Sequence, residues 1–298
     1  MRGLTLDLDR PRIMAIVNVT PDSFSDAGRH ETPDRALAYC ERALADGAAM
    51  LDIGGESTRP GATRIDAAEQ IRRVVPVVER LRAAGIETPI SVDTTRATVA
   101  RAAIEAGANA INDVSGGTED PDMLALAAET GAGIVLMHRL RPPGEDRFSD
   151  RYRAQEAPDY GAGPGEVGDV VGVVMQALGE MVHRAEIAGI ARERIVIDPG
   201  LGFGKTVAQN FALAEALHTM MQEIGCEALS AASRKSFLGR AMADALGLAD
   251  PPPPEERDAA TLTLSAAHAM RGVRLFRVHD VRGHAEGLGA VGRMSEVL

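Results

Sequence analysis

One local pattern repeats along this chain and limits the folds that it can adopt. A helix-like stretch ends near a glycine, and a short apolar run that suits a β-strand follows within a few residues. The segments "CERALADGAAMLDIGG", "RAAIEAGANAINDVSG" and "VHRAEIAGIARERIVIDPG" show it. Glycine tolerates the left-handed backbone that commonly follows the last helical turn. The pattern therefore predicts helix ends at Gly47, Gly107, Gly131, Gly189 and Gly272.

Eight apolar runs of this kind follow one another, with helix-like stretches between them. The predicted strands are Ile13–Asn18, Met50–Gly54, Ile90–Asp93, Ala110–Asp113, Ile134–His138, Arg194–Asp198, Glu227–Ala231 and Leu275–His279. Most are continuously apolar, as expected of parallel strands buried on both faces. Eight β-α units in 298 residues predict an α/β protein, one (β/α)8 TIM barrel that forms a single domain over residues 1–298. A doubly wound open sheet is the alternative.

Long loops are expected after the first, second and fifth strands. The longest covers residues 140–168, which are polar and rich in glycine and proline. Residues 250–257, "DPPPPEER", predict a stiff connector before the helix that leads to the last strand. Neither segment is typical of a domain boundary.

The composition argues against several classes of protein. A net charge of −11 and a pI near 5.2 argue against a nucleic-acid partner, which needs a basic face. The two cysteines, Cys40 and Cys226, lack the spacing of a zinc site or a disulfide framework, which fits a reducing compartment. The N-terminal segment contains no apolar run long enough for a signal peptide or a membrane span. We therefore expect a cytoplasmic protein without a membrane partner.

Polar side chains stand at the end of every predicted strand. In a barrel these ends open onto one face, where active sites of this fold lie. Asp93, Asn112 and Asp198 supply carboxylates and an amide there. Because a carboxylate can accept two parallel hydrogen bonds from an amino-pyrimidine edge, these residues predict a pocket for a flat heterocycle. Helix capping is the alternative for each of them alone, and also for Asp113.

A second set of polar groups suits an anion. Arg59, Arg277 and His279 form a cationic set that fits diphosphate oxygens, and Asn18 stands at another strand end. The amide oxygen of Asn18 can ligate Mg²⁺, which usually keeps water and substrate phosphate as its other ligands. A surface ion pair is the alternative for each arginine, and a structural role is the alternative for His279.

Nucleophilic catalysis has little support in the sequence. There is no G-x-S-x-G elbow, and neither cysteine follows a strand beside a base. Lys235, one of only two lysines, follows the seventh strand and keeps a Schiff-base aldolase open. The stretch "GLGFGK" lacks the Walker spacing, so we interpret its glycines as a tight turn with close backbone approach to a ligand. Phe203 in this stretch can cover an aromatic ring or simply pack.

Seven motifs together resemble those of the dihydropteroate synthases. They are "NVTPDSFSDAG", "LDIGGESTRPGA", "ISVDTT", "INDVSGG", "VIDPGLGFGKT", "SRKSFLG" and "RVHDV", and they extend from about residue 12 to residue 282. "VDTT" and "DPG" also occur in related pterin-binding barrels, such as methyltetrahydrofolate-dependent methyltransferases, whereas "NVTPDSFSD", "SRKSF" and "RVHDV" distinguish the synthases. A methyl-transfer or binding barrel is therefore the alternative.

The resemblance implies a reaction and a role for each matching residue. The family joins dihydropterin-methyl diphosphate to 4-aminobenzoate in folate biosynthesis, releases diphosphate, uses Mg²⁺ and is usually a homodimer. The implied pterin site is Asp93, Asn112, Met137, Asp198, Phe203 and Lys235, with Asp93, Asp198 and Lys235 catalytic. The implied diphosphate site is Thr58, Arg59, Arg277 and His279; the 4-aminobenzoate site is Phe24, Thr58, Pro60 and Ser233; the metal ligand is Asn18.

The resemblance also implies how the pocket closes and reacts. Loops 20–26 and 57–61 would close over a pterin-methyl cation that Asp93 and Asp198 stabilise, without a covalent enzyme intermediate. Two features depart from the family pattern. Ala231 stands where the family often has glycine, and its methyl is expected to crowd the pterin-side wall. The stretch "MHRLRPPGED" departs from the usual Met-His-Gly-Thr-Pro.

Overall fold

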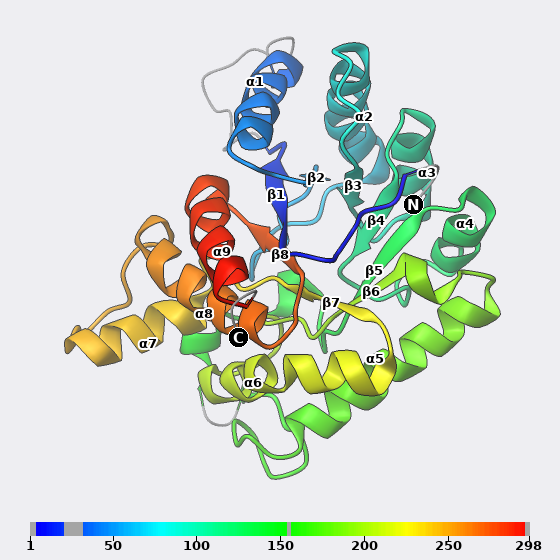
Figure 1. Cartoon of the computed structure of the whole chain (residues 1–298). Helices are drawn as coiled ribbons and strands as arrows, with labels where there is room; N and C mark the ends of the chain where they lie inside the picture. Colours follow the sequence, from blue (N-terminus) through cyan, green and yellow to red (C-terminus); the bar gives the residue numbers. More distant parts are fainter. Residues whose placement is uncertain (1–3, 21–31, 154–155, 296–298) are drawn as a thin grey trace.

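Eight parallel strands close into a barrel in chain order, and β1 pairs with both β2 and β8 (Figure 1). The structure is a computed structural model that describes residues 4–20, 32–153 and 156–295. The strands are β1 Arg12–Asn18, β2 Met50–Gly54, β3 Ile90–Asp93, β4 Ala110–Asp113, β5 Gly133–Met137, β6 Ile195–Asp198, β7 Glu227–Ser230 and β8 Leu275–Val278. The predicted TIM barrel is thus confirmed, and the open-sheet alternative is wrong.

The helices cover the outside of the barrel (Figure 1). They are α1 Thr32–Ala45, α2 Ala67–Ala83, α3 Ala97–Glu105, α4 Met123–Thr130, α5 Val170–Ile187, α6 Val207–Ile224, α7 Ser236–Leu246, α8 Asp258–Met270 and α9 Val281–Ser295. Two of them, α7 and α8, join β7 to β8, with the short 3-10 helix Pro254–Arg257 at the end of the proline-rich connector. Within the described ranges, no helix has the length and apolar character needed to cross a membrane.

The element boundaries follow local chemistry. Each strand boundary lies within one residue of its predicted position. All five glycines predicted at helix ends have positive φ, and Gly131 caps α4 in the left-handed conformation with φ 68°. A capping box, in which Thr206 and Gln209 bond reciprocally, starts α6.

The loops after β2 and β5 are long, as predicted. Residues 55–66 connect β2 to α2, and residues 138–169 connect β5 to α5. The described part of the second connection contains two 3-10 helices, Pro143–Glu145 and Ser149–Arg151. Most of the loop expected after the first strand, residues 21–31, lies outside the described residues.

The interior of the barrel changes from apolar to polar along the strands. Its N-terminal end is filled by Met14, Met50, Ala110, Val135, Leu229 and Leu275, and Ala231 packs against this group from the next layer. Because side chains in a strand alternate, the residue two positions further along each strand also faces the interior, one layer higher. On β2 and β4 those residues are Asp52 and Asn112, which are hydrogen-bonded to each other. The same alternation therefore builds both the apolar floor and the polar layer above it.

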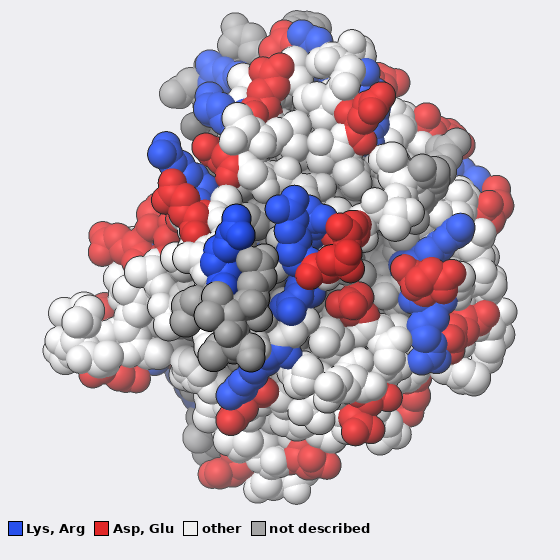
Figure 2. Space-filling model, in the orientation of Figure 1, with Lys and Arg blue, Asp and Glu red and all other residues white. Residues whose placement is uncertain are grey.

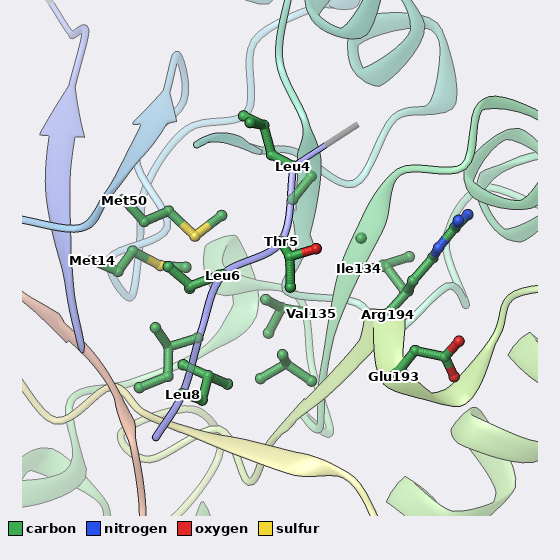
Figure 3. Close-up of a pocket in the computed structure, with 14 residues that line it drawn as sticks. Leu4, Thr5, Leu6, Leu8, Met14, Met50, Ile134, Val135, Glu193 and Arg194 are labelled. Carbon is green, nitrogen blue, oxygen red and sulfur yellow. The ribbon is translucent and has the colours of Figure 1, made fainter. Parts of the chain in front are cut away.

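The N-terminal segment covers the apolar floor. Residues 4–8 run across this end of the barrel, and a cavity of about 510 Å³ lies beneath them. Figure 3 shows Leu6 and Leu8 beside Met14 and Met50 on the cavity wall. The cavity lies at the end of the barrel opposite to the polar strand ends.

On the face of the molecule seen in Figure 2, acidic and basic side chains are interspersed rather than segregated.

We expect that filling this cavity stabilises the fold. Ala110 lines the cavity from β4, so Ala110→Val should raise the free energy of unfolding by about 0.5–2 kcal/mol and increase Tm. Ala15 on β1 is fully buried in the dense layer between strands and helices, so the matched Ala15→Val should lower it by about 1–3 kcal/mol. Thermal unfolding followed by circular dichroism measures both. Equal losses of Tm in the two variants would show that the cavity has no usable room.

Candidate active site

A guanidinium joins two carboxylates from neighbouring strands inside the barrel mouth. Arg277 on β8 donates from Nε to Asp52 Oδ2 at 2.6 Å and from Nη2 to Asp93 Oδ2 at 2.8 Å. Asp52 is fully buried, and Asp93 is 6% exposed. Because an unpaired buried charge is costly, this pairing allows two carboxylates to remain in the barrel interior. Arg277 thus contacts the heterocycle end of the predicted site, whereas the sequence assigned it to the diphosphate.

Asp52 is a site residue that the sequence prediction missed. Its Oδ1 accepts a hydrogen bond from Ser91 at 2.5 Å, and its Oδ2 accepts one from Asn112 Nδ2 at 3.0 Å. This second bond fixes the orientation of the Asn112 amide, so that its oxygen is on the side away from Asp52. The available signal was an acidic residue inside the otherwise apolar run "MLDIG".

Burial shifts the ionisation of the groups around this pair. It raises the pKa of Asp93, although Arg277 opposes the shift. Burial also raises the pKa of Asp198, whose Oδ1 accepts the N–H of Gly200 at 2.7 Å. The pKa of Lys235 is lowered by burial to about 8, with Asp198 opposing. The mouth of the barrel therefore holds carboxylates and cations whose charges depend on one another.

An apolar wall stands beside these charges. Val114, Met137 and Phe203 form a separate buried cluster, which brings together the two residues predicted to face a ring. Lys235 Nζ lies 4.0 Å from the centroid of the Phe203 ring, a cation–π contact. Phe203 thus packs in the apolar cluster, and the face of its ring contacts the Lys235 ammonium.

The glycines of "GLGFGK" allow the tight turn predicted after β6. The close approaches that the structure records are to the chain itself. Gly200 has φ +69°, and a Cβ there would lie 1.9 Å from the carbonyl oxygen of His138. Gly202 has φ +81°, and a Cβ there would lie 2.8 Å from Lys235 Cδ. Any larger residue at either position would push against the strand 5 end or against the site lysine.

The "SRK" turn after β7 orients three side chains. Arg234 has φ 59°, and its guanidinium makes two bonds of 2.7 Å to Asp258. Ser233 Oγ accepts the backbone N–H of His279 at 3.1 Å and lies 2.9 Å from Nδ1 of the same residue. This pairing orients the imidazole, and the ring proton lies on Nε2 when the hydroxyl donates to Nδ1. The Arg234 guanidinium thus points to Asp258.

His279 differs from the cationic group that the sequence predicted. Burial, together with the nearby guanidinium groups of Arg234 and Arg277, lowers the pKa of His279 to about 3. The imidazole is therefore neutral near pH 7 in the ligand-free protein. It offers an oriented N–H donor, rather than a charge, to a bound anion.

Other predicted residues lie at varied distances from this centre. Thr58 and Asp93 line the same small hollow, together with Val114 and Arg139. Arg59 is exposed and Pro60 is partly buried, and neither lines that hollow. Asn18, at the end of β1, is partly exposed and pairs in register with Gly54.

Three further predictions have different outcomes. Phe24 lies outside the described residues. The carboxylate of Asp113 accepts the backbone N–H groups of Ser115 and Gly117 at 2.7 and 2.8 Å, so it caps a turn. Ala231 packs in the buried apolar cluster with Leu275 and Met14, but it follows the Ser230–Phe276 pair and so lies beside Arg277, one layer above Leu229; the expected crowding of the pterin-side wall stays a prediction.

The assembled site has three chemically distinct sides. Carboxylates and an amide face an apolar wall, an ammonium group lies against that wall, and a neutral imidazole with a guanidinium lies at the β8 end. Such an arrangement can bind a flat ring with polar edges and hold an anion next to it.

Known proteins match this chain over nearly its full length. The family model described as "Pterin binding enzyme" matches residues 14–279. The dihydropteroate synthase of Mycobacterium leprae is 46% identical over 281 residues, which cover 94% of this chain and 92% of that protein.

Two solved structures of Xanthomonas albilineans dihydropteroate synthase share the fold. The one with 4-aminobenzoic acid has a TM-score of 0.83 and 42% identity, and the one with 7,8-dihydropteroate has a TM-score of 0.80 and 39% identity. Each alignment covers 97% of this chain and 95% of the other. With a barrel, a site and matches of this extent, the chain belongs to the dihydropteroate synthase family of pterin-binding enzymes.

Proposed function

We propose that this chain is a transferase that joins (7,8-dihydropterin-6-yl)methyl diphosphate to 4-aminobenzoate, giving 7,8-dihydropteroate and diphosphate in folate biosynthesis. The observation that carries the proposal is the meeting of Asp93, Asn112 and Lys235 with the apolar wall of Met137 and Phe203 at the barrel mouth. A pterin is a flat ring with donors and acceptors along its edge, and this site matches both properties. The 4-aminobenzoic acid and dihydropteroate bound to the Xanthomonas relative support the same substrates.

The buried carboxylate and amide oxygens would accept hydrogen bonds from the edge of the pterin ring. Asp93 and Asp198 can each accept N–H donors of the ring, and the outward amide oxygen of Asn112 can accept another. Lys235, as a compact ammonium over the Phe203 ring, would donate to ring oxygen or nitrogen of the pterin, while its stem passes beside Gly202. Met137 would lie against the ring face.

The anionic end of the substrate would lie toward β8. His279 would present Nε2–H to a diphosphate oxygen while its Nδ1 accepts from the Ser233 hydroxyl. Thr58 and Arg59 lie on the β2–α2 loop, which reaches the long β5 loop through the bond from Gly61 N–H to the Pro143 carbonyl at 2.8 Å. Pro60 and Ser233 would border the 4-aminobenzoate.

The reaction needs no enzyme nucleophile. The C–O bond to diphosphate breaks and its electron pair leaves with the diphosphate, while the carboxylates of Asp93 and Asp198 stabilise the pterin-methyl cation. The neutral amine nitrogen of 4-aminobenzoate then forms the new C–N bond and releases its proton. Arg277 would serve both ends, because it pairs with Asp93 and lies two residues before His279, which follows β8 directly.

We also propose Mg²⁺ as the cofactor, with Asn18 as its protein ligand. No group of three or more His, Cys, Asp or Glu among the described residues is placed to hold a metal. An amide oxygen with substrate and water as the remaining ligands suits Mg²⁺. Bound there, Mg²⁺ would offset the charge of the departing diphosphate. Asn18→Ala should raise the Mg²⁺ concentration that gives half-maximal turnover, and an unchanged requirement would exclude Asn18.

A homodimer and a cytoplasmic location complete the proposal. Helices α6, α7 and α8 contact one another, and each exposes a large apolar side chain: Phe211, Leu246 and Met270. Such side chains support a face that a second copy covers, and sedimentation would detect twice the mass of 31.4 kDa. The two cysteines are buried and unpaired, which fits a reducing compartment.

Turnover tests the proposed reaction directly. Purified protein with Mg²⁺, the pterin diphosphate and 4-aminobenzoate should release diphosphate and form dihydropteroate. His279→Ala should lower kcat/KM at least about tenfold by removing a donor to a charged group, while binding of 6-hydroxymethylpterin, which lacks the diphosphate, stays unchanged. Pterin binding without any diphosphate release would favour the methyl-transfer or binding barrel. Borohydride trapping of a substrate on Lys235 would favour an aldolase.

Lys235 provides a test of size as well as charge. Lys235→Arg keeps the charge, but Gly202 lies against the stem and Phe203 against the ammonium, so pterin affinity should fall about tenfold or more. Since the folded-state pKa of Lys235 is about 8, the ammonium is present below that pH and lost above it. Pterin affinity measured by calorimetry should therefore weaken above pH 8 in the wild type. Lys235→Met should lack this step, since titration of the ligand itself is common to both proteins. A silent Lys235→Arg would refute the size argument.

A further inference from the structure

The loop between β6 and α6, which carries Phe203, is held from within by a buried lysine. Lys205 is fully buried, and its Nζ donates to the carbonyls of Phe203, Gly200 and His138 at 2.8, 3.0 and 3.3 Å. These bonds use all three ammonium hydrogens. They tie the end of β5 to the loop that follows β6.

The long β5–α5 connection holds the same loop from the other side. Asp146 Oδ2 accepts the N–H of Gly204 at 2.7 Å, and the Tyr160 hydroxyl donates to the Gly204 carbonyl at 3.1 Å. Both side chains are buried, with 6% and 2% exposure. The residue that follows Phe203 thus has both backbone polar groups bonded to the 138–169 connection.

Asp146 is itself fixed before it reaches the loop. Its Oδ1 accepts the N–H of Arg147 at 2.8 Å and the hydroxyl of Tyr152. The segment around it is anchored as well, because Ser149 N–H donates to Ser236 Oγ at 2.9 Å and Ser149 Oγ accepts from Asn210 at 3.0 Å. Asp146 closes the stretch "MHRLRPPGED", where the chain departs from the family pattern. The Asp146 carboxylate is therefore held in position to accept the Gly204 N–H.

We propose that Asp146 is a positioning residue for pterin binding, acting through Phe203. The peptide group that follows Phe203 is bonded on both sides, its carbonyl to Lys205 and its N–H to Asp146, and the Phe203 ring packs against Met137 and lies 4.0 Å from the Lys235 ammonium. Without the Asp146 carboxylate, the Gly204 N–H has no partner in a buried site, and the loop must shift to reach water. Such a shift moves Phe203 away from Lys235 and from the ring that both contact. This inference rests on the proposed pterin site.

The direct test compares two aspartates of the same connection. Asp146→Ala should weaken binding of 6-hydroxymethylpterin about tenfold in titration calorimetry, since a buried donor loses its partner. Asp159→Ala is the matched control, because Asp159 is exposed and its carboxylate accepts the nearby N–H groups of Gly161 and Gly163 at 2.9 and 3.0 Å. It should bind like the wild type. A role in stability alone would lower Tm and the bound fraction but leave the dissociation constant unchanged.

A double-mutant cycle shows whether the effect passes through Phe203. Phe203→Ala should weaken pterin binding, and Asp146→Ala should then add little to it. Additive losses would overturn the proposal. If Asp146→Ala does not fold, Tyr160→Phe replaces it, because this change removes only the hydroxyl bond to Gly204. Tyr160→Phe should lower pterin affinity severalfold in the wild-type background. It should cause no further loss when Phe203 is already alanine. An unchanged pterin affinity in Tyr160→Phe would refute the role of these hydrogen bonds in pterin binding. A wild type that binds no pterin would instead refute the proposed function.

Discussion

The contact of Arg277 with Asp52 and Asp93 is the interaction on which the rest of the site depends. Two carboxylates inside a barrel would repel each other and lose their hydration, and one guanidinium that reaches both removes most of that cost. Arg277 comes from β8 and its two partners come from β2 and β3, so this contact forms only when the sheet has closed. The closed barrel and the polar site are thus two consequences of one strand alternation, with Met50 below and Asp52 above on the same strand.

The two lysines show why ammonium groups were kept in a chain that otherwise uses arginine. Lys205 sits where three carbonyl oxygens converge, and Lys235 passes beside Gly202 to lie over Phe203. A planar guanidinium cannot occupy either place, because it needs a wider space and directs its hydrogens in one plane. Both lysines border the same loop after β6. One organises that loop from within, and the other meets the ligand beside it.

Much of this could be predicted from local sequence, and the remainder depended on long-range contacts. Apolar runs and helix-ending glycines predicted every strand to within one residue, because parallel buried strands are uniformly apolar. The meeting of Asp93, Asn112 and Asp198 followed from the closure of the barrel. The neutral state of His279 could not be predicted, since it results from burial and from the guanidinium groups of Arg234 and Arg277, which only the folded barrel brings beside it. Asp52 and Asp146 were missed because their partners are separated from them by 225 and 58 residues.

A structure of the complex with a non-hydrolysable pterin diphosphate analogue tests the central claim most directly, because it shows which side chains contact each end of the ligand. The account predicts the pterin edge within hydrogen-bond distance of Asp93, Asn112 and Asp198, the ring against Phe203, and the diphosphate at His279 Nε2. It also predicts that Asp52 keeps Arg277 at the barrel mouth. A ligand bound in the apolar cavity under residues 4–8, or a diphosphate away from β8, would contradict it.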